Sequence, residues 1–286
     1  MQSTAAPYRS SDTSDEDRPL VDIRQLHVSF GNHEVLRNIT LQVPRGETLA
    51  LIGESGCGKT VLIKTIIGLL QPTRGEVLFD GLNFQRIDER ELTHQRARFG
   101  FLFQQAALFD SLTIGENVAF PLRQQGRQDE QQIRQIVSAG LAEVGLSDSV
   151  IDRRPAELSG GMRKRVGLAR ALVLNPEIML YDEPTTGLDP IMSDIINELI
   201  VRTRDRSNAT SIVVTHDMNS ARKVADRIAM IYPLPRLQGD ESQIIFDGTA
   251  EELDDAEDPR VRQFTNGEAG DRLMELRDQA RLHDDA

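Results

Sequence analysis

Gly53-Glu54-Ser55-Gly56-Cys57-Gly58-Lys59-Thr60 lies between two apolar runs, residues 48–52 and 61–70. A short continuous apolar run such as 48–52 is typical of a strand that is buried on both faces of a parallel sheet. The glycines let backbone N–H groups curl around an anion, and a helix that follows directs its positive end at that anion. The pattern of Gly, four residues and Gly-Lys-Thr therefore predicts a strand, a phosphate-binding loop and a helix.

This loop predicts a site for ATP and Mg²⁺. Lys59 is expected to reach the β and γ phosphates, and the Thr60 hydroxyl is expected to bind the metal. Cys57 is the single cysteine of the chain, and we interpret it as a small loop residue rather than a redox switch. The residues predicted to bind the nucleotide here are Gly53, Glu54, Ser55, Gly56, Cys57, Gly58, Lys59 and Thr60.

A second apolar run, Ile178–Tyr181, ends in Asp182 and Glu183. Asp182 is expected to hold Mg²⁺ through water, and Glu183 is expected to orient and polarise the attacking water. An Asp-Glu pair at a strand end is ordinary when it stands alone. Together with the phosphate loop it predicts a nucleotide hydrolase.

The rest of the chain reads as an α/β domain with additions. Apolar runs at residues 99–103, 211–215 and 227–232 are separated by helical or mixed segments, which favours a parallel sheet. Residues 21–30 and 35–43 alternate between apolar and polar, which predicts an antiparallel edge sheet. An amphipathic helix is predicted at 129–144, with one apolar face. That face comprises Ile133, Ile136, Val137, Leu141 and Val144.

These patterns divide the chain into a flexible acidic tail at 1–19, an ATPase domain at 20–250 with a helical subdomain at about 105–168, and a C-terminal extension at 251–286. Leu273, Leu276 and Ala280 of the extension can share a helix face. The sequence leaves open whether the extension is a solvated tail or a helix that docks a partner or stabilises a dimer.

Charge and composition narrow the class of protein. The chain has 286 residues, 39% of them hydrophobic, which suffices for a core. A net charge of −12 argues against a nucleic-acid partner and against attraction to an anionic membrane surface. The apolar runs are shorter than the roughly 20 residues of a membrane-spanning helix, and the acidic N-terminus lacks the features of a secretory signal. A cytoplasmic location is therefore expected.

The run Glu157–Met162 decides which kind of hydrolase to expect. Ser159 can cap a helix whose N–H groups, with Gly160 and Gly161, present a second anion-binding surface, and residues 163–165 add positive charge. The run resembles the signature of ABC ATPases, with Met162 where glutamine is commonest. This resemblance extends over residues 20–250. It implies a P-loop NTPase core with a RecA-like parallel sheet, an antiparallel β subdomain and an inserted α-helical subdomain.

Further site residues follow from the resemblance to ABC ATPases. Gln104 resembles the glutamine that senses magnesium and the γ-phosphate, and His216 resembles the histidine that contacts the γ-phosphate. Gly187-Leu188-Asp189 resembles the loop that crosses the dimer interface. Phe30 takes the place of the aromatic residue that stacks on adenine, where tyrosine is commoner. The resemblance also implies a homodimer across two ATP molecules, each between the Lys59 loop of one chain and Ser159, Gly160, Gly161 and Asp189 of the other.

One subfamily fits best. The runs Leu102–Phe109, Asn117–Leu122 and Asp258–Phe264, with the methionine in the signature, resemble the ATPases of Mla-type, MCE-associated lipid transporters. The resemblance implies an integral membrane permease docked beside Ala106–Pro121, an MCE lipid-binding protein and, in some systems, a small STAS-domain protein. The ATPase would then be peripheral on the cytoplasmic face of the inner membrane.

Two points remain open at this stage. The chain departs from the family pattern at residues 232–243, where a usually short hairpin is longer. That segment either alters a partner contact or is a tolerated surface loop. The alternative function is the ATPase of an ABC importer for a small solute. A non-transport ABC ATPase fits less well, since the chain has no long coiled coil, zinc module or second cassette.

Overall fold

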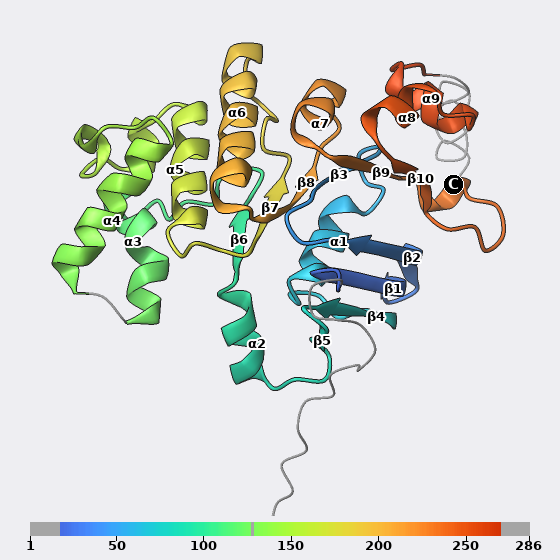
Figure 1. Cartoon of the computed structure of the whole chain (residues 1–286), viewed down its shortest axis with the longest axis horizontal. Helices are drawn as coiled ribbons and strands as arrows, with labels where there is room; N and C mark the ends of the chain where they lie inside the picture. The colour runs from blue at the N-terminus through green and yellow to red at the C-terminus, as the bar shows by residue number, and fades with distance from the viewer. Residues whose placement is uncertain (1–17, 127–128, 270–286) are drawn as a thin grey trace, which may run out of the picture.

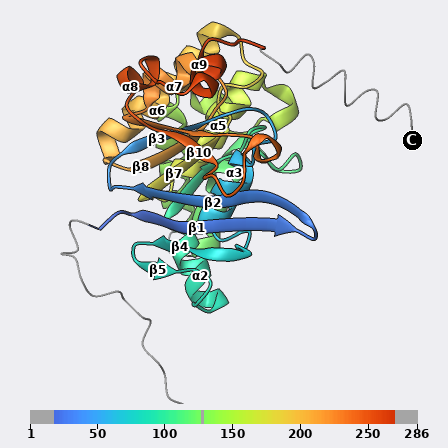
Figure 2. The ribbon, with the colours of Figure 1, turned by 90° about the vertical axis from the view of Figure 1, so that its right-hand side faces the viewer.

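A computed structural model of the chain describes residues 18–126 and 129–269. They form a six-stranded sheet, a four-stranded sheet and the helices around them (Figures 1 and 2). The six-stranded sheet has the order β10-β9-β3-β8-β7-β6, in which β10 alone is antiparallel to its neighbour. Its strands are β3 (Thr48–Ile52), β6 (Phe99–Leu102), β7 (Ile178–Asp182), β8 (Thr210–Val214), β9 (Arg227–Ile231) and β10 (Ile244–Gly248).

The short apolar runs form the parallel strands, as predicted. Every residue of β3, β7 and β8 is buried. Leu49 and Leu51 of β3 pack into the core that is shared with the antiparallel sheet, whereas Ala50 and Ile52 pack with Leu253. Alternate residues of β3 thus serve two cores, and this explains why residues 49–52 are all apolar.

The antiparallel sheet has the order β2-β1-β4-β5, which confirms the edge sheet. β1 (Val21–Phe30) and β2 (His33–Val43) were predicted, whereas β4 (Arg74–Phe79) and β5 (Leu82–Asn83) were not. β4 begins with Arg74, Gly75 and Glu76. Its apolar segment is therefore too short for a strand to be identified from the sequence pattern. Its pairing with β1 places its apolar end against helix α1 (Lys59–Ile66), in the same core.

A helical layer packs beyond β6 (Figure 1). It contains α3 (Ile114–Gln125), α4 (Glu130–Glu143) and α5 (Gly160–Leu172), with short turns at Asp148–Val150 and Pro155–Glu157. The predicted amphipathic helix is confirmed as α4, which begins after Asp129 because that carboxylate accepts a hydrogen bond from the backbone of Gln132. The exact limits of the helical subdomain remain a prediction. The remaining helices are α2 (Glu89–Arg96), α6 (Pro190–Ser207), α7 (Met218–Val224), α8 (Ala250–Asp254) and α9 (Pro259–Thr265).

The structure describes only part of each end of the chain. The start of the predicted extension is part of the core, because Leu253 and Val261 are fully buried against β3 and β9. The predicted tail up to residue 17, and the proposed helix face at Leu273, Leu276 and Ala280, lie outside the described residues. Across residues 18–126 and 129–269, no helix has both the length and the apolar character needed to cross a membrane.

Candidate nucleotide-binding site

The glycine-rich loop joins β3 to α1, and two of its glycines are required by their surroundings. Gly53 has a φ of 146°, and a Cβ atom there would collide with the carbonyl oxygen of Ile231 in β9. Gly58 has a φ of 103°, and a Cβ atom there would lie 2.6 Å from Cδ2 of Leu36 in β2. The loop is therefore held between β9 and β2 in a conformation that other residues rarely adopt.

Lys59 holds its positive charge inside this loop. Its side chain is buried, and its Nζ donates hydrogen bonds to the carbonyl oxygens of Gly53 at 2.7 Å and Glu54 at 2.8 Å. Gly58 precedes α1 and provides no side-chain cap. The first N–H groups of a helix have no partner within the helix, so they and the ammonium together make an anion site.

Thr60 connects the loop to the end of β7. Its Oγ1 donates a hydrogen bond of 3.0 Å to Oδ1 of Asp182. Asp182 is buried, and this burial raises the pKa of its carboxyl group, while the bond from Thr60 opposes the rise. A cation beside Asp182 would relieve that cost. The described residues contain no group of three or more His, Cys, Asp or Glu side chains that would form a cage. Hydroxyl and carboxylate oxygens completed by nucleotide phosphates are what Mg²⁺ prefers.

Glu183 follows Asp182 and has two side-chain partners. The Thr186 hydroxyl donates to its Oε2 at 3.0 Å, and Nδ1 of His216 lies 2.8 Å from the same oxygen. His216 follows β8, the strand next to β7, which explains how residues so distant in sequence meet. The structure thus brings Lys59, Thr60, Asp182, Glu183 and His216 to the carboxyl ends of β3, β7 and β8.

Two contributors to this group were not recognised in the sequence. Thr186 was missed because a hydroxyl in a turn carries no distinct signal. Lys164 was expected to add positive charge beside Ser159, but it is buried and donates to the carbonyl oxygens of Glu183 at 3.0 Å and Pro184 at 2.7 Å. Burial lowers the pKa of Lys164 to about 8. Its role in the structure is to support the turn that carries Glu183.

The signature residues form a second group. Ser159 begins α5 and accepts a hydrogen bond from the backbone of Met162 at 3.3 Å. Asp189 begins α6 and accepts from the backbone of Ile191 and Met192 at 3.0 Å. Gly160 and Gln104 line a cavity of about 560 Å³ that also includes Thr186, Gly187 and Leu188. None of the loop residues 53–60 lines that cavity, whereas Thr186 and Lys164, which contact Glu183, both line it.

Phe30 lies at the end of β1, where the strand turns into β2. Phe30 is 51% exposed, which is unusual for a phenylalanine in a strand. A ring in this position is open to stacking against a flat ligand. Its predicted contact with adenine remains a prediction.

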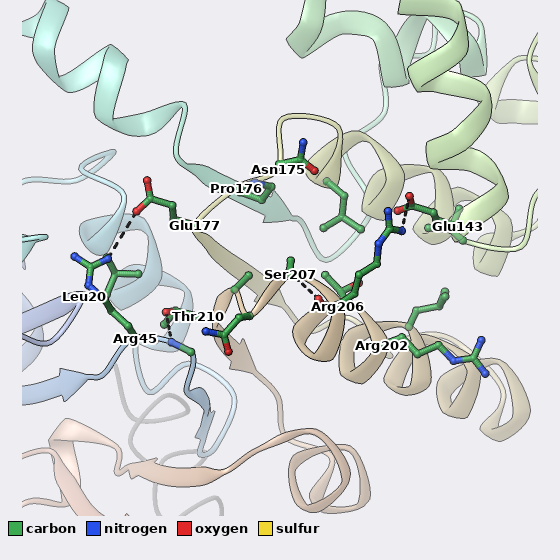
Figure 3. Close-up of a pocket in the computed structure, with 17 residues that line it drawn as sticks. Leu20, Arg45, Glu143, Asn175, Pro176, Glu177, Arg202, Arg206, Ser207 and Thr210 are labelled. Atoms are coloured by element: carbon green, nitrogen blue, oxygen red, sulfur yellow. Dashed lines mark hydrogen bonds and ion pairs between the residues drawn. The ribbon is translucent and has the colours of Figure 1, made fainter. Parts of the chain in front are cut away.

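A larger cavity, of about 690 Å³, lies at the other end of the sheet (Figure 3). It is lined by residues next to the amino ends of β7 and β8, among them Glu177 and Thr210. Its charged groups include the ion pair of Arg206 with Glu143 at 2.6 Å. Open α/β sheets bind ligands at the carboxyl ends of their strands. This cavity is therefore not the nucleotide site.

Comparison with known proteins places this arrangement in a family. The family model described as ABC transporter matches residues 36–186, which include the phosphate loop, the Ser159 helix and Glu183. The chain belongs to the ABC transporter family. It is an ABC ATPase that binds and hydrolyses ATP, and the predicted fold class and activity are confirmed. The roles of individual site residues remain predictions.

Curated relatives of this ABC ATPase cover most of the chain. A probable ribonucleotide transport ATP-binding protein, mkl of Mycobacterium leprae, is 42% identical over 86% of this chain and 69% of its own. The intermembrane phospholipid transport system ATP-binding protein MlaF of Haemophilus influenzae is 42% identical over 87% of this chain and 91% of its own. The chloroplastic protein TRIGALACTOSYLDIACYLGLYCEROL 3 of Arabidopsis thaliana is 38% identical over 87% and 74%.

Solved ABC cassettes have the same fold. The cassette MJ0796, described as a dimer in a post-hydrolysis state with ADP and Pi, is 33% identical and has a TM-score of 0.71. The match covers 80% of this chain and 98% of that one. The cassette cbiO1 of Clostridium perfringens, part of the ABC transporter complex cbiONQ, is 26% identical with a TM-score of 0.72 over 92% of this chain.

The environment of Cys57 in this ABC ATPase predicts an unreactive thiol. Its side chain is 3% exposed, and burial raises the pKa of the thiol. The thiolate is the reactive form, so we expect the native chain to react with iodoacetamide at neutral pH at least about tenfold more slowly than the chain in urea. Mass spectrometry of timed samples measures this directly, because the chain has a single cysteine. Equal rates in the two states would indicate an exposed, redox-sensitive thiol.

Proposed function

We propose that this ABC ATPase energises the transport of phospholipids or related lipids between membranes, as a homodimer that binds an integral membrane permease. The observation that carries the proposal is the 42% identity to the phospholipid transport protein MlaF over 91% of that protein's length. Its further partners would be an MCE lipid-binding protein and, in some systems, a STAS-domain protein. The ATPase would lie on the cytoplasmic face of the inner membrane, held there by the permease.

The phosphate loop and the Ser159 helix do not line one common cavity, and this supports an ATP site made by two chains. The Lys59 loop supplies cation and N–H donors, whereas Ser159 with Gly160 supplies a second helix N-terminus elsewhere on the molecule. Ile191 is 74% exposed and Ile195 is 39% exposed at the start of α6, beside Asp189. Such apolar exposure suits a surface that a second copy covers. ATP would lie between the loop of one chain and the Ser159 helix of the other.

The site chemistry follows from the contacts around β7. Thr60 and Asp182 would hold Mg²⁺, which when bound offsets the charge on the phosphates. Glu183 would orient the attacking water and accept its proton. Its two donors both use Oε2, so Oε1 is the oxygen on which that water would be positioned. His216 holds the carboxylate and would contact the γ-phosphate, while Gln104 would approach Mg²⁺ and the γ-phosphate when the site closes.

Replacing Glu183 by glutamine tests the assigned base. We expect Glu183→Gln to bind ATP but to lower turnover by about 100-fold or more, because an amide cannot accept the proton. The ATP-bound dimer should then persist during size-exclusion chromatography. Glu177→Gln is a matched control, since Glu177 precedes the same strand at its opposite end and pairs with Arg98. Unchanged turnover in Glu183→Gln would contradict the assignment.

An aromatic groove supports the predicted permease contact. It has a volume of about 410 Å³ and lies between β6, α3 and α5. Phe109 is 45% exposed and Phe120 is 38% exposed, and their ring centroids are 4.9 Å apart. Buried Asn117 fixes this surface, since its side chain bonds both the N–H and the carbonyl of Phe109 at 2.8 and 3.1 Å. A rigid, exposed apolar groove is suited to a short apolar helix of a permease.

Affinity purification tests the partner and the groove together. The tagged chain, purified from detergent-solubilised membranes of its source cells, is expected to recover an integral permease, an MCE protein and phospholipid. Phe109→Ala should reduce recovery of the permease by about fivefold or more, because a central aromatic contact is lost. Leu69→Ala is the control, since Leu69 is 51% exposed elsewhere on the surface.

The same purification discriminates between substrates. The similarity to mkl, which is described as a probable ribonucleotide transport protein, favours a second candidate, the ATPase of a transporter for small solutes. Recovery of a solute permease with a soluble binding protein, and without lipid, would replace lipid transport by that candidate. Recovery of no membrane protein would contradict both. Equal recovery with Phe109→Ala and the unaltered chain would remove the groove as the docking site.

A further inference from the structure

The segment between β9 and β10, residues 232–243, packs against the phosphate loop. Its ends are joined by the hydrogen bond from the Tyr232 N–H to the Gln243 carbonyl at 2.8 Å. Its middle contains a short helical turn, Leu234–Arg236. The Ser242 hydroxyl donates to the Asn38 carbonyl of β2 at 3.2 Å. The lengthened hairpin is thus held on the core at several points, although residues 238–241 between them are exposed.

Gln243 anchors this segment to the loop. Its side chain is fully buried. The amide Nε2 lies 3.2 Å from the carbonyl oxygen of Cys57 and 3.3 Å from that of Val35, and Oε1 accepts from the N–H of Arg37 at 2.8 Å. Cys57 belongs to the phosphate loop, whereas Val35 and Arg37 belong to β2. A buried amide that uses both its donor and its acceptor fixes the three segments relative to one another.

Arg236 reaches the loop through a charge pair. Its Nη1 lies 2.8 and 2.9 Å from the two carboxylate oxygens of Glu54. The Glu54 side chain is 15% exposed and that of Arg236 is 28% exposed, so the pair is screened less than a surface pair. Glu54 is also the residue whose carbonyl oxygen binds the Lys59 ammonium. The carboxylate of Glu54 thus places a negative charge in the same loop that is expected to bind the negatively charged phosphates.

A half-buried carboxylate in an anion-binding loop repels the ligand, because like charges in a low-dielectric site are weakly screened. Arg236 cancels this charge from outside the loop. We propose that Arg236, supplied by the lengthened β9–β10 segment, is a positioning residue that neutralises Glu54 and so sets the affinity of the phosphate loop for ATP. The proposal rests on the ATPase activity of the chain and is independent of what the transporter carries.

The test compares the single variant Arg236→Gln with a double variant of the full chain, in the presence of Mg²⁺ and ATP. We expect Arg236→Gln to weaken ATP binding by roughly tenfold, because it removes the positive charge that lies 2.8 and 2.9 Å from the Glu54 carboxylate oxygens. The double variant Glu54→Gln with Arg236→Gln should recover most of this loss, to within about threefold of the unaltered chain, because no charge is left to repel the phosphates. Displacement of a fluorescent nucleotide measures the ATP affinity of both variants at low and high salt. High salt should reduce the difference in affinity between Arg236→Gln and the unaltered chain.

Steady-state kinetics and a control variant show whether the effect of Arg236→Gln is confined to ATP binding. Arg236→Gln should raise the KM for ATP while kcat at saturating ATP stays close to that of the unaltered chain, because the pair does not touch the reacting atoms. Arg123→Gln is the matched control, since Arg123 pairs with Glu130 through two hydrogen bonds of 3.0 and 2.8 Å on the exposed helical layer. Its ATP affinity should not change.

Several outcomes would overturn the proposal. ATP binding by Arg236→Gln equal to that of the unaltered chain would show that the pair has no influence on the loop. If the double variant binds ATP as weakly as Arg236→Gln alone, Arg236 acts by contacting the nucleotide or by holding the conformation of the loop, and not by neutralising Glu54. If Arg236→Gln does not fold, as judged by thermal unfolding, Arg236→Lys replaces it. That variant keeps the charge and should retain most of the affinity, and a tenfold loss there would contradict charge compensation.

Discussion

The conformation of the phosphate loop depends on the contacts of the buried Lys59 ammonium. A lysine buried in this way requires partners, and Lys59 finds them in the carbonyl oxygens of Gly53 and Glu54. Gly53 and Gly58, which flank this part of the loop, adopt left-handed conformations close against β9 and β2, where a Cβ atom would collide. The strands β9 and β2 on either side of the loop therefore hold it in the conformation in which it surrounds the Lys59 ammonium.

Parallel strand order explains how the rest of the site assembles. β3, β8 and β7 are neighbours, so their carboxyl ends place Thr60, His216 and Glu183 at one edge although they are far apart in sequence. The contacts at that edge are specific. Thr60 pairs with Asp182, and His216 pairs with Glu183, each within 3.0 Å. Lys164 supports the same turn from α5, which links the signature helix to the backbone of Glu183.

Sequence reasoning predicted those parts of the structure that depend on local patterns. Continuous apolar runs identified the five parallel strands, and the glycine-rich pattern identified the turn that joins β3 to α1, because each pattern reflects a constraint within a few residues. β4 was missed because only half of it is apolar, and its pairing with β1 determines it. The pair of Arg236 with Glu54 could not be predicted, since it joins residues from distant segments whose contact depends on the whole sheet.

ATP bound between two chains would lie in a site to which each chain contributes a different half. The most direct test mixes two inactive variants, Lys59→Ala and Ser159→Arg, and measures ATP hydrolysis. A mixed dimer has one site in which the intact Lys59 loop of one chain faces the intact Ser159 helix of the other. The account predicts that the mixture regains ATPase activity that neither variant shows alone. A mixture that remains inactive although the chains exchange into mixed dimers would contradict a site shared between two chains.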